Sequence, residues 1–599
     1  MSWVHASHST TIHDYRRRIG GGAPPSENSH IRLRYYQKKI PNFSVAPFDR
    51  PPRLPINKPT TKPKICIIGA GMSGLFSALL LQKAGIQQIT ILECQDRVGG
   101  RVHTQYFSEN KEEKLYGELG AMRLPVASEH QMVFDTIDYL NERIPEDNRI
   151  NLIDFIFSNE NGLYFYNDVR GDDGKIENMA WANDTQNFNK LGFPSTVHPD
   201  YKYLLYDAMS GFFRALDLDF ESGLESLMKF DQHSVYSFLK EVYFPNLIPS
   251  LCQKFDVDDT IAAMEMTESA TGLFRLSFVE AVMDAYTFSN DSQKWKTIDY
   301  GMQRFPNSFP LAFEHEKHHG NVEIKYKCKV YKLESVDVDG VSKVRVHWEE
   351  NGNNTNHTFD RVIITCPLGV VRHWDLPGLK NLEESPERDS FYNKKRAIRE
   401  LNYDNSAKIF LKFRSRFWEK SNIRGGSSTT DLPIRTVIYP SYYDGKDIEN
   451  PAILLGSYTW ANDAAKFAPH LQDNVRLCLK DLKILHGDQI EDLWDKDPKY
   501  NRSIYWPNEP TTVGAFALFG PSQYSDLMYP MIKSMYNIHW AGEHTDIHHA
   551  WIVGALNSAV RVVQEILVHS DMEEEWENLL KENPLKNWHG HIENENESP

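Results

Sequence analysis

The sequence has few cysteines and no apolar run typical of an export signal or a membrane span. Its six cysteines are widely scattered and include no Cys-x-x-Cys pair, so neither a disulfide framework nor a zinc site is predicted. Residues 1–20 lack the apolar stretch of a signal peptide, and we therefore expect a cytoplasmic protein. The most apolar segment, residues 65–81, contains glycines typical of a buried strand and helix.

Positive charge is scarce relative to negative charge. The 66 lysines and arginines face 82 aspartates and glutamates, for a net charge of −16, which argues against binding to nucleic acid or to an anionic membrane. There is no phosphate-binding loop ending in Lys-Ser/Thr and no nucleophile elbow. A length of 599 residues with 41% hydrophobic content instead predicts a globular enzyme of two or three domains.

An apolar, β-branched run leads directly into three glycines with the spacing of a dinucleotide-binding turn. Gly69 permits the tight turn, Gly71 lets a pyrophosphate approach the backbone, and Gly74 lets the following helix pack on the strand. The N-terminus of that helix offers amide donors and partial positive charge. A second predicted strand at residues 88–92 ends in Glu93, which is placed to accept hydrogen bonds from a ribose.

The turn Gly99-Gly100-Arg101 distinguishes between the possible dinucleotides. A nicotinamide dehydrogenase has no general need for it, whereas in flavoproteins with two dinucleotide-binding motifs it brings backbone and an arginine against the FAD diphosphate. A block near the C-terminus resembles the closing FAD motif of these proteins. There Glu543 would bind the ribitol chain, and a helix beginning near Ala550 would point its N-terminus at the flavin carbonyl region.

The cofactor domain is predicted to be discontinuous, because its two motifs lie near residues 70 and 543. The predicted fold is α/β, with a discontinuous FAD-binding Rossmann-like domain, a mixed-sheet substrate-binding domain and a helical insertion. The predicted division is a Pro-rich extended arm (1–60), the FAD-binding domain (61–105, 291–400 and 525–570), the substrate-binding domain (106–130 and 401–524), the helical domain (131–290) and an acidic tail (571–599) that ends in disorder.

Residues 64–567 resemble the L-amino acid oxidase branch of the flavin monoamine oxidase family. Four further blocks carry the resemblance: residues 117–125, 300–306, 406–411 and 425–433. By this resemblance, Arg123 would bind the substrate carboxylate, with Tyr439 as its second ligand. An arginine matches a carboxylate as a bidentate fork and a phenol caps the remaining lone pair, which offsets the cost of desolvating the anion.

The resemblance also assigns roles to residues around the flavin ring. Lys408 would hold a water near flavin N5, Trp551 would form one wall of the cavity, and Trp506 the facing wall, with a simple core role open for Trp506. Ala550 stands where the family often has a glycine whose carbonyl receives the substrate amine. The predicted FAD-binding residues are Gly69, Gly71, Met72, Ser73, Gly74, Glu93, Cys94, Arg101, Gly120, Ala121, Met122, Arg123, Val330, Glu543, Ala550, Trp551, Ile552, Val553, Gly554 and Ala555.

The predicted reaction is FAD-dependent oxidative deamination of L-amino acids by dioxygen, in a homodimer or higher homo-oligomer by family analogy. Monoamine oxidases attach FAD through a cysteine before the closing motif; residues 501–549 contain none, so non-covalent FAD is expected. Histidines in the closing motif and in residues 314–319 are interpreted as solvated or packed against the cofactor, and no metal is predicted. An amino acid 2-monooxygenase, a polyamine or monoamine oxidase, and a non-enzymatic flavoprotein remain as alternatives.

Overall fold

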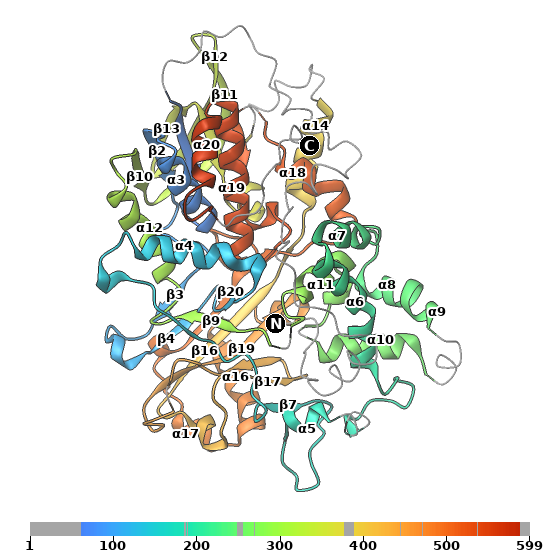
Figure 1. Ribbon diagram of the computed structural model, residues 1–599. Coiled ribbons are helices and arrows are strands. Elements are labelled where there is room, and N and C mark those ends of the chain that lie inside the picture. Colours follow the sequence, from blue (N-terminus) through green and yellow to red (C-terminus); the bar gives the residue numbers. More distant parts are fainter. Residues whose placement is uncertain are drawn as a thin grey trace.

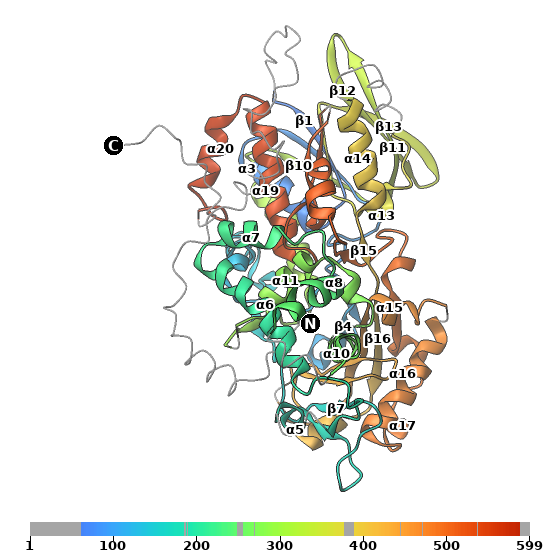
Figure 2. The same cartoon turned by 90° about the vertical axis from the view of Figure 1, so that its right-hand side faces the viewer.

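The computed structural model describes residues 62–586 apart from 185–186, 188–189, 248–254, 269, 291, 377–387, 444, 470 and 536. The predicted N-terminal arm and residues 587–599 of the predicted tail lie outside the described residues. Two sheet-containing parts occupy opposite ends of the molecule, and a group of helices lies beside them (Figure 1). The view turned by 90° shows the same order from end to end (Figure 2).

A five-stranded parallel sheet, with the strand order β10-β2-β1-β14-β22, carries the glycine motif. Its strands come from all three segments assigned to the FAD-binding domain. The central strand β1 is buried from its second residue onward, as its apolar, β-branched composition predicts for a parallel strand covered on both faces. The strands are β1 (Lys64–Ile68), β2 (Gln88–Leu92), β10 (Asn321–Lys325), β14 (Arg361–Ile364) and β22 (Ile538–Trp540).

Helices pack on this sheet, and α3 and α19 lie side by side (Figure 1). Among the described residues, α19 is the one helix long and apolar enough to cross a membrane, but 78% of it is buried inside the protein, as in a core helix. A separate antiparallel sheet, β11-β12-β13, projects from this end (Figure 2). The elements are α3 (Met72–Lys83), α4 (Gln131–Asn141), α12 (Arg304–His315), α19 (Ile552–His569), β11 (Cys328–Val338), β12 (Val341–Glu350) and β13 (Asn353–Phe359).

The segment predicted as an acidic tail begins with a helix. Helix α20 (Glu573–Leu580) packs against α19, and Trp576 and Leu579 are buried at its contact face. These two residues are three positions apart, so they share one face of a helix despite the acidic run before them.

A mixed seven-stranded sheet, with the order β20-β16-β19-β18-β17-β7-β8, forms the opposite end. Its central strands β16 and β19 are buried along their whole length. Strands β7 and β8 come from the segment assigned to the helical domain (131–290), so that boundary differs from the prediction: β7 pairs in parallel with β17. The strands are β7 (Leu163–Phe165), β8 (Glu177–Asn178), β16 (Ser406–Phe413), β17 (Ser427–Thr430), β18 (Thr436–Ile438), β19 (Ala452–Trp460) and β20 (Arg502–Tyr505).

The helical insertion lies between the two ends (Figure 2). Helix α11 is buried along nearly its whole length, which brings its residues against both sheet-containing parts. The short strands β4 and β5 belong to two small sheets, in which β4 pairs with β3 and β5 pairs with β9. The elements are α6 (Tyr201–Leu218), α7 (Phe220–Met228), α8 (Val235–Phe238), α10 (Val257–Thr267), α11 (Phe278–Tyr286), β3 (Thr104–Tyr106), β4 (Tyr116–Glu118), β5 (Leu124–Pro125), β6 (Leu152–Asp154) and β9 (Trp295–Ile298).

Candidate functional site

One long cavity joins the parallel sheet to the seven-stranded sheet. At one end it is lined by the glycine turn after β1 and by Glu93 at the end of β2; at the other it is lined by Lys408 of β16, by Tyr458 of β19 and by Asp284 of α11. Ligands of open α/β sheets bind beyond the carboxyl ends of the strands, and the cavity begins there. All three predicted domains therefore contribute to one site.

The glycine turn has the geometry that the sequence predicts. Gly69 has φ +104°, a conformation that favours glycine. A Cβ at Gly71 would meet no atom within 4 Å, so the backbone there is open to the cavity, whereas a Cβ at Gly74 would lie 2.0 Å from the Gly69 carbonyl oxygen. The Glu93 carboxylate accepts a 2.7 Å hydrogen bond from the backbone N–H of Ala70, which holds it at the cavity edge.

Two helices begin at this cavity without a side-chain cap. Helix α3 has Gly71 as its N-cap and α19 has Trp551, and neither residue caps the helix through its side chain. Both residues line the cavity. The uncapped amides and the positive ends of both helix dipoles therefore face the space where a dinucleotide diphosphate and a flavin ring would lie. The residues present fit FAD.

An ion pair between a partly buried arginine and a buried glutamate lies in the cavity wall. Arg101 Nη1 lies 2.7 Å from Glu543 Oε1, and the Glu543 carboxylate also accepts hydrogen bonds from the backbone N–H groups of Ala517 and Ala550, at 3.2 and 3.0 Å. Burial alone would raise the pKa of Glu543, but Arg101 and two nearby histidines lower it below its usual value. The glutamate of the closing motif is thus ionised and held in one orientation.

Lys408 points inward from the buried strand β16. Its Nζ donates to the backbone carbonyl oxygens of Glu118 and Gly120, at 2.8 and 2.6 Å. Burial lowers the Lys408 pKa to about 7, with the Glu118 carboxylate opposing that shift and Arg123 reinforcing it. An amine that titrates near neutral pH thus lines the cavity.

Arg123 lies inside the molecule, between β4 and β5, among aromatic rings. Its guanidinium carbon is 5.0, 5.4 and 5.5 Å from the ring centroids of Phe157, Phe288 and Trp295. No carboxylate lies within ion-pair distance of it in the described part of the chain. Burial lowers the Arg123 pKa to about 10, so the group is charged at neutral pH.

Aromatic side chains form the walls near Arg123. Trp551 packs against His130 and Phe288, with ring centroids 5.2 and 5.8 Å apart. Trp506 is buried, lines the same cavity and donates its indole N–H to the Leu119 carbonyl oxygen at 3.1 Å. Both tryptophans therefore line the cavity, and their roles as facing walls over a bound flavin stay a prediction.

Tyr439 does not reach the cavity, which corrects its assignment as a carboxylate ligand. It is fully buried in a separate core, where its hydroxyl hydrogen-bonds to Ser428 at 2.7 Å and to His486 at 2.9 Å. Its neighbour Ile438 lines a smaller cavity that also contacts Arg123. Successive residues of an extended strand point to opposite faces, so an assignment displaced by one residue selects the wrong face.

Sixteen of the predicted FAD-binding residues line the cavity and four do not. Gly74, Val553 and Gly554 lie in the helices behind it: a Cβ at Gly554 would lie 2.2 Å from the His548 carbonyl oxygen. Val330 is buried in β11, and its contact with adenine stays a prediction. The sixteen lining residues are Gly69, Gly71, Met72, Ser73, Glu93, Cys94, Arg101, Gly120, Ala121, Met122, Arg123, Glu543, Ala550, Trp551, Ile552 and Ala555.

Several cavity residues were missed by sequence reasoning. Asp284 and Phe288 come from the helical insertion, and His130 from the turn before α4, where no motif marks them. Tyr458 and Trp460 lie on β19. Tyr458 is the direct cross-strand partner of Lys408, so strand pairing is the signal that would have found it.

The fold and the cavity together define a flavoprotein of the amine oxidase type. The chain belongs to the family of flavin containing amine oxidoreductases, whose model matches residues 72–567. Among solved structures, putrescine oxidase bound to putrescine is similar with a TM-score of 0.58 and 14% identity, covering 85% of this chain and 100% of that chain. At that identity the likeness shows the shared fold alone.

The chain is also similar to several L-amino-acid oxidases. L-amino-acid oxidase 4 of Hebeloma cylindrosporum is 30% identical over 558 residues, covering 86% of this chain and 84% of that protein. The L-amino-acid oxidase of Siganus canaliculatus is 30% identical over 509 residues, covering 84% and 85%. A Dictyostelium discoideum protein named as a bifunctional amine oxidase is 32% identical over 541 residues, and the match covers 85% of this chain and 46% of that protein.

Proposed function

We propose that the protein is an L-amino-acid oxidase that holds FAD without a covalent bond. It converts an L-amino acid, dioxygen and water to a 2-oxo acid, ammonia and hydrogen peroxide. The observation that carries this proposal is the charged Arg123 guanidinium, which lines the cavity among aromatic rings. Aromatic faces attract a cation but do not neutralise it, whereas the carboxylate of an amino acid would.

Tyr458 is the phenol best placed to assist Arg123. It lines the same cavity, and Arg123 and Tyr458 interact electrostatically. Burial raises the Tyr458 pKa, so its hydroxyl stays protonated at neutral pH and can donate a hydrogen bond to the carboxylate. We therefore assign to Tyr458 the role that the sequence had suggested for Tyr439.

The remaining groups position the substrate. Trp551 and Trp506 form walls that restrict its orientation, and the Lys408 amine, with a pKa of about 7, can hold a water near the reacting carbon. FAD, when bound, takes up the electrons of the Cα–H bond and passes them to dioxygen. The amino-acid sequence identifies no side chain as a general base.

Asp284 introduces a negative charge on the substrate side. It lines the cavity, is 8% exposed, and raises the pKa of Arg123 against the effect of burial. A second anion on the substrate would be repelled there. We expect neutral or cationic side chains to be preferred over acidic ones.

The test is an anaerobic flavin-bleaching screen across L-amino acids, D-amino acids and amines without a carboxylate. Rapid bleaching by L-amino acids, followed in air by equal yields of peroxide, ammonia and 2-oxo acid, is expected. An amide with carbon dioxide would instead identify a 2-monooxygenase. Bleaching by amines alone would identify an amine oxidase, and no bleaching by any compound a flavoprotein without this activity.

Two properties beyond the catalytic site complete the proposal. We propose a homodimer, measured by light scattering on the purified FAD-loaded protein, for which a monomer is the contrary outcome. We also propose a cytoplasmic location, measured by fractionation of cells that express the full chain. Recovery with a membrane or secreted fraction would contradict it.

A further inference from the structure

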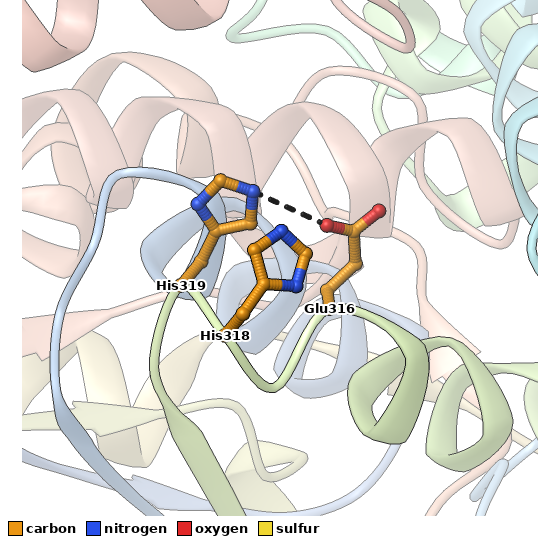
Figure 3. A group of neighbouring side chains, drawn as sticks. All are labelled: Glu316, His318 and His319. Carbon is orange, nitrogen blue, oxygen red and sulfur yellow. Dashed lines mark ion pairs between the residues drawn. The ribbon is translucent and has the colours of Figure 1, made fainter.

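A group of potential metal ligands lies on the turn between α12 and β10, outside the cavity. Glu316, His318 and His319 each offer one ligand atom, and these atoms lie within 4.8 Å of one another (Figure 3). None of the three residues lines the cofactor cavity. The sequence suggested solvated histidines here, because the segment is polar and precedes a strand; it could not show that the nearby Glu316 carboxylate is buried.

The protein already orients the Glu316 carboxylate. The residue is 5% exposed; its Oε1 accepts a 2.6 Å hydrogen bond from Arg143 Nε and a 3.3 Å hydrogen bond from the Tyr139 hydroxyl. Hydrogen bonds to the other atom of a metal ligand fix the orientation of that ligand.

The second oxygen of Glu316 faces a histidine nitrogen at the spacing of a metal site. Glu316 Oε2 lies 3.4 Å from His319 Nε2 (Figure 3). Two ligands at bond lengths of about 2.0–2.1 Å in a tetrahedral site lie roughly 3.3 Å apart. The His318 ring lies beside that of His319, with centroids 4.0 Å apart, and both side chains are solvent-exposed. Exposed rings can turn to close the remaining gap, and solvent gives the ion access.

We propose that Glu316, His318 and His319 form a binding site for a divalent transition-metal ion of the Zn²⁺ class. Two imidazoles and one carboxylate suit Zn²⁺, Ni²⁺ or Cu²⁺ and disfavour Ca²⁺ and Mg²⁺, which take oxygen ligands. Three protein ligands leave a fourth position for water. Because Glu316 is also held by Arg143, which lies two residues beyond the end of α4, the ion would join the turn to the segment after α4 and stabilise this edge of the cofactor domain.

The proposal is tested by calorimetric titration of the full-length, FAD-loaded protein with Zn²⁺, and by the visible absorption of bound Co²⁺. Wild type is expected to show one more Zn²⁺ site than His318→Ala or His319→Ala, or an affinity more than about tenfold higher at that site. Zn²⁺ should raise the melting temperature of wild type and lose that effect in both variants. These substitutions keep the Arg143–Glu316 ion pair, so both variants are expected to fold.

His315→Ala is the matched control. His315 is an exposed histidine of the same segment, and its Nδ1 lies 3.6 Å from Glu316 Oε1, the oxygen that Arg143 already contacts. The His315→Ala variant should bind Zn²⁺ as wild type does. Equal Zn²⁺ stoichiometry and affinity in wild type, His318→Ala and His319→Ala would overturn the proposal, and so would an equal loss in His315→Ala.

Discussion

Replacing Arg123 by methionine should lower kcat/KM for amino acids and leave kcat/KM nearly unchanged for amines that have the same side chain. Methionine keeps much of the apolar contact with the three surrounding rings but removes the cation. The substrate carboxylate would then enter the cavity without its main counter-charge. Loss of one partner of such a buried pair destabilises the complex by about 2–5 kcal/mol. At 1.4 kcal/mol per decade, kcat/KM for the amino acid should fall roughly 30- to several-thousand-fold.

Lys408, another basic group of the cavity, determines the pH at which the assay is run. Lys408 has a pKa of about 7, so at pH 8 it is mostly neutral and compensates little, whereas Arg123, with a pKa of about 10, is still charged. We would measure kcat/KM at pH 8 for an L-amino acid and for the corresponding decarboxylated amine. The amino-acid value should fall by the factor above, and the amine value should change little. The ratio of the two kcat/KM values reports the carboxylate interaction, because a general loss of active protein would lower both values equally.

Arg416→Met is the matched control for this experiment. Arg416 likewise places its guanidinium over an aromatic ring, 4.5 Å from the Tyr443 centroid, but it is buried, pairs with Glu419 and does not line the cavity. Its loss should lower stability and leave the amino acid-to-amine ratio unchanged. The assigned role of Arg123 would be refuted if Arg123→Met retained FAD and lowered kcat/KM equally for the amino acid and the amine. It would also be refuted if amino acid turnover stayed intact.

Three further substitutions test the rest of the site. Lys408→Met removes the Lys408 amine, whose pKa is about 7, and with it a charge that lowers the pKa of Glu118, which burial raises to about 7. A step of kcat/KM near pH 7 that Lys408 causes should be lost and one that Glu118 causes should move to higher pH, and an unchanged profile would contradict both assignments. Glu543→Gln leaves Arg101 without its ion pair, and we expect the free energy of unfolding to fall by about 3 kcal/mol. This variant should also lose FAD during gel filtration, whereas Glu543→Asp, which keeps the carboxylate, should retain it. Asp284→Asn should raise kcat/KM for L-glutamate relative to L-glutamine by about tenfold; an unchanged ratio would exclude charge selection there.

The cofactor half of the site was predictable because its determinants are local. The glycine spacing after β1 requires a tight turn and a close helix, and the structure has both, with Gly69 at φ +104° and Gly74 against the Gly69 carbonyl. Glu93 was identified by its position at the end of the next strand, where parallel strands bring it to the same edge. A motif of neighbouring residues constrains geometry without knowledge of the rest of the chain.

The substrate half was only partly predictable. Arg123 and Lys408 were found through motifs, and the structure brings both to the cavity. Tyr439 was wrong because a strand reverses the direction of its side chains at each residue, and the sequence did not define which face meets the cavity. The strands β7 and β8 were assigned to a helical region because β7 pairs with β17, which lies more than 250 residues away, and β8 joins the sheet through β7.

Sequence alone specified the class of cofactor, since the strand, turn, helix and acid that hold a dinucleotide follow one another within about 30 residues. Tertiary packing decided which distant side chains share a space: Asp284 and Tyr458 join Arg123 only because α11 and β19 converge on the same cavity. It also buried Glu316 beside the exposed His318 and His319. Burial and convergence depend on long-range contacts, and these determine the charge state and the direction of each group.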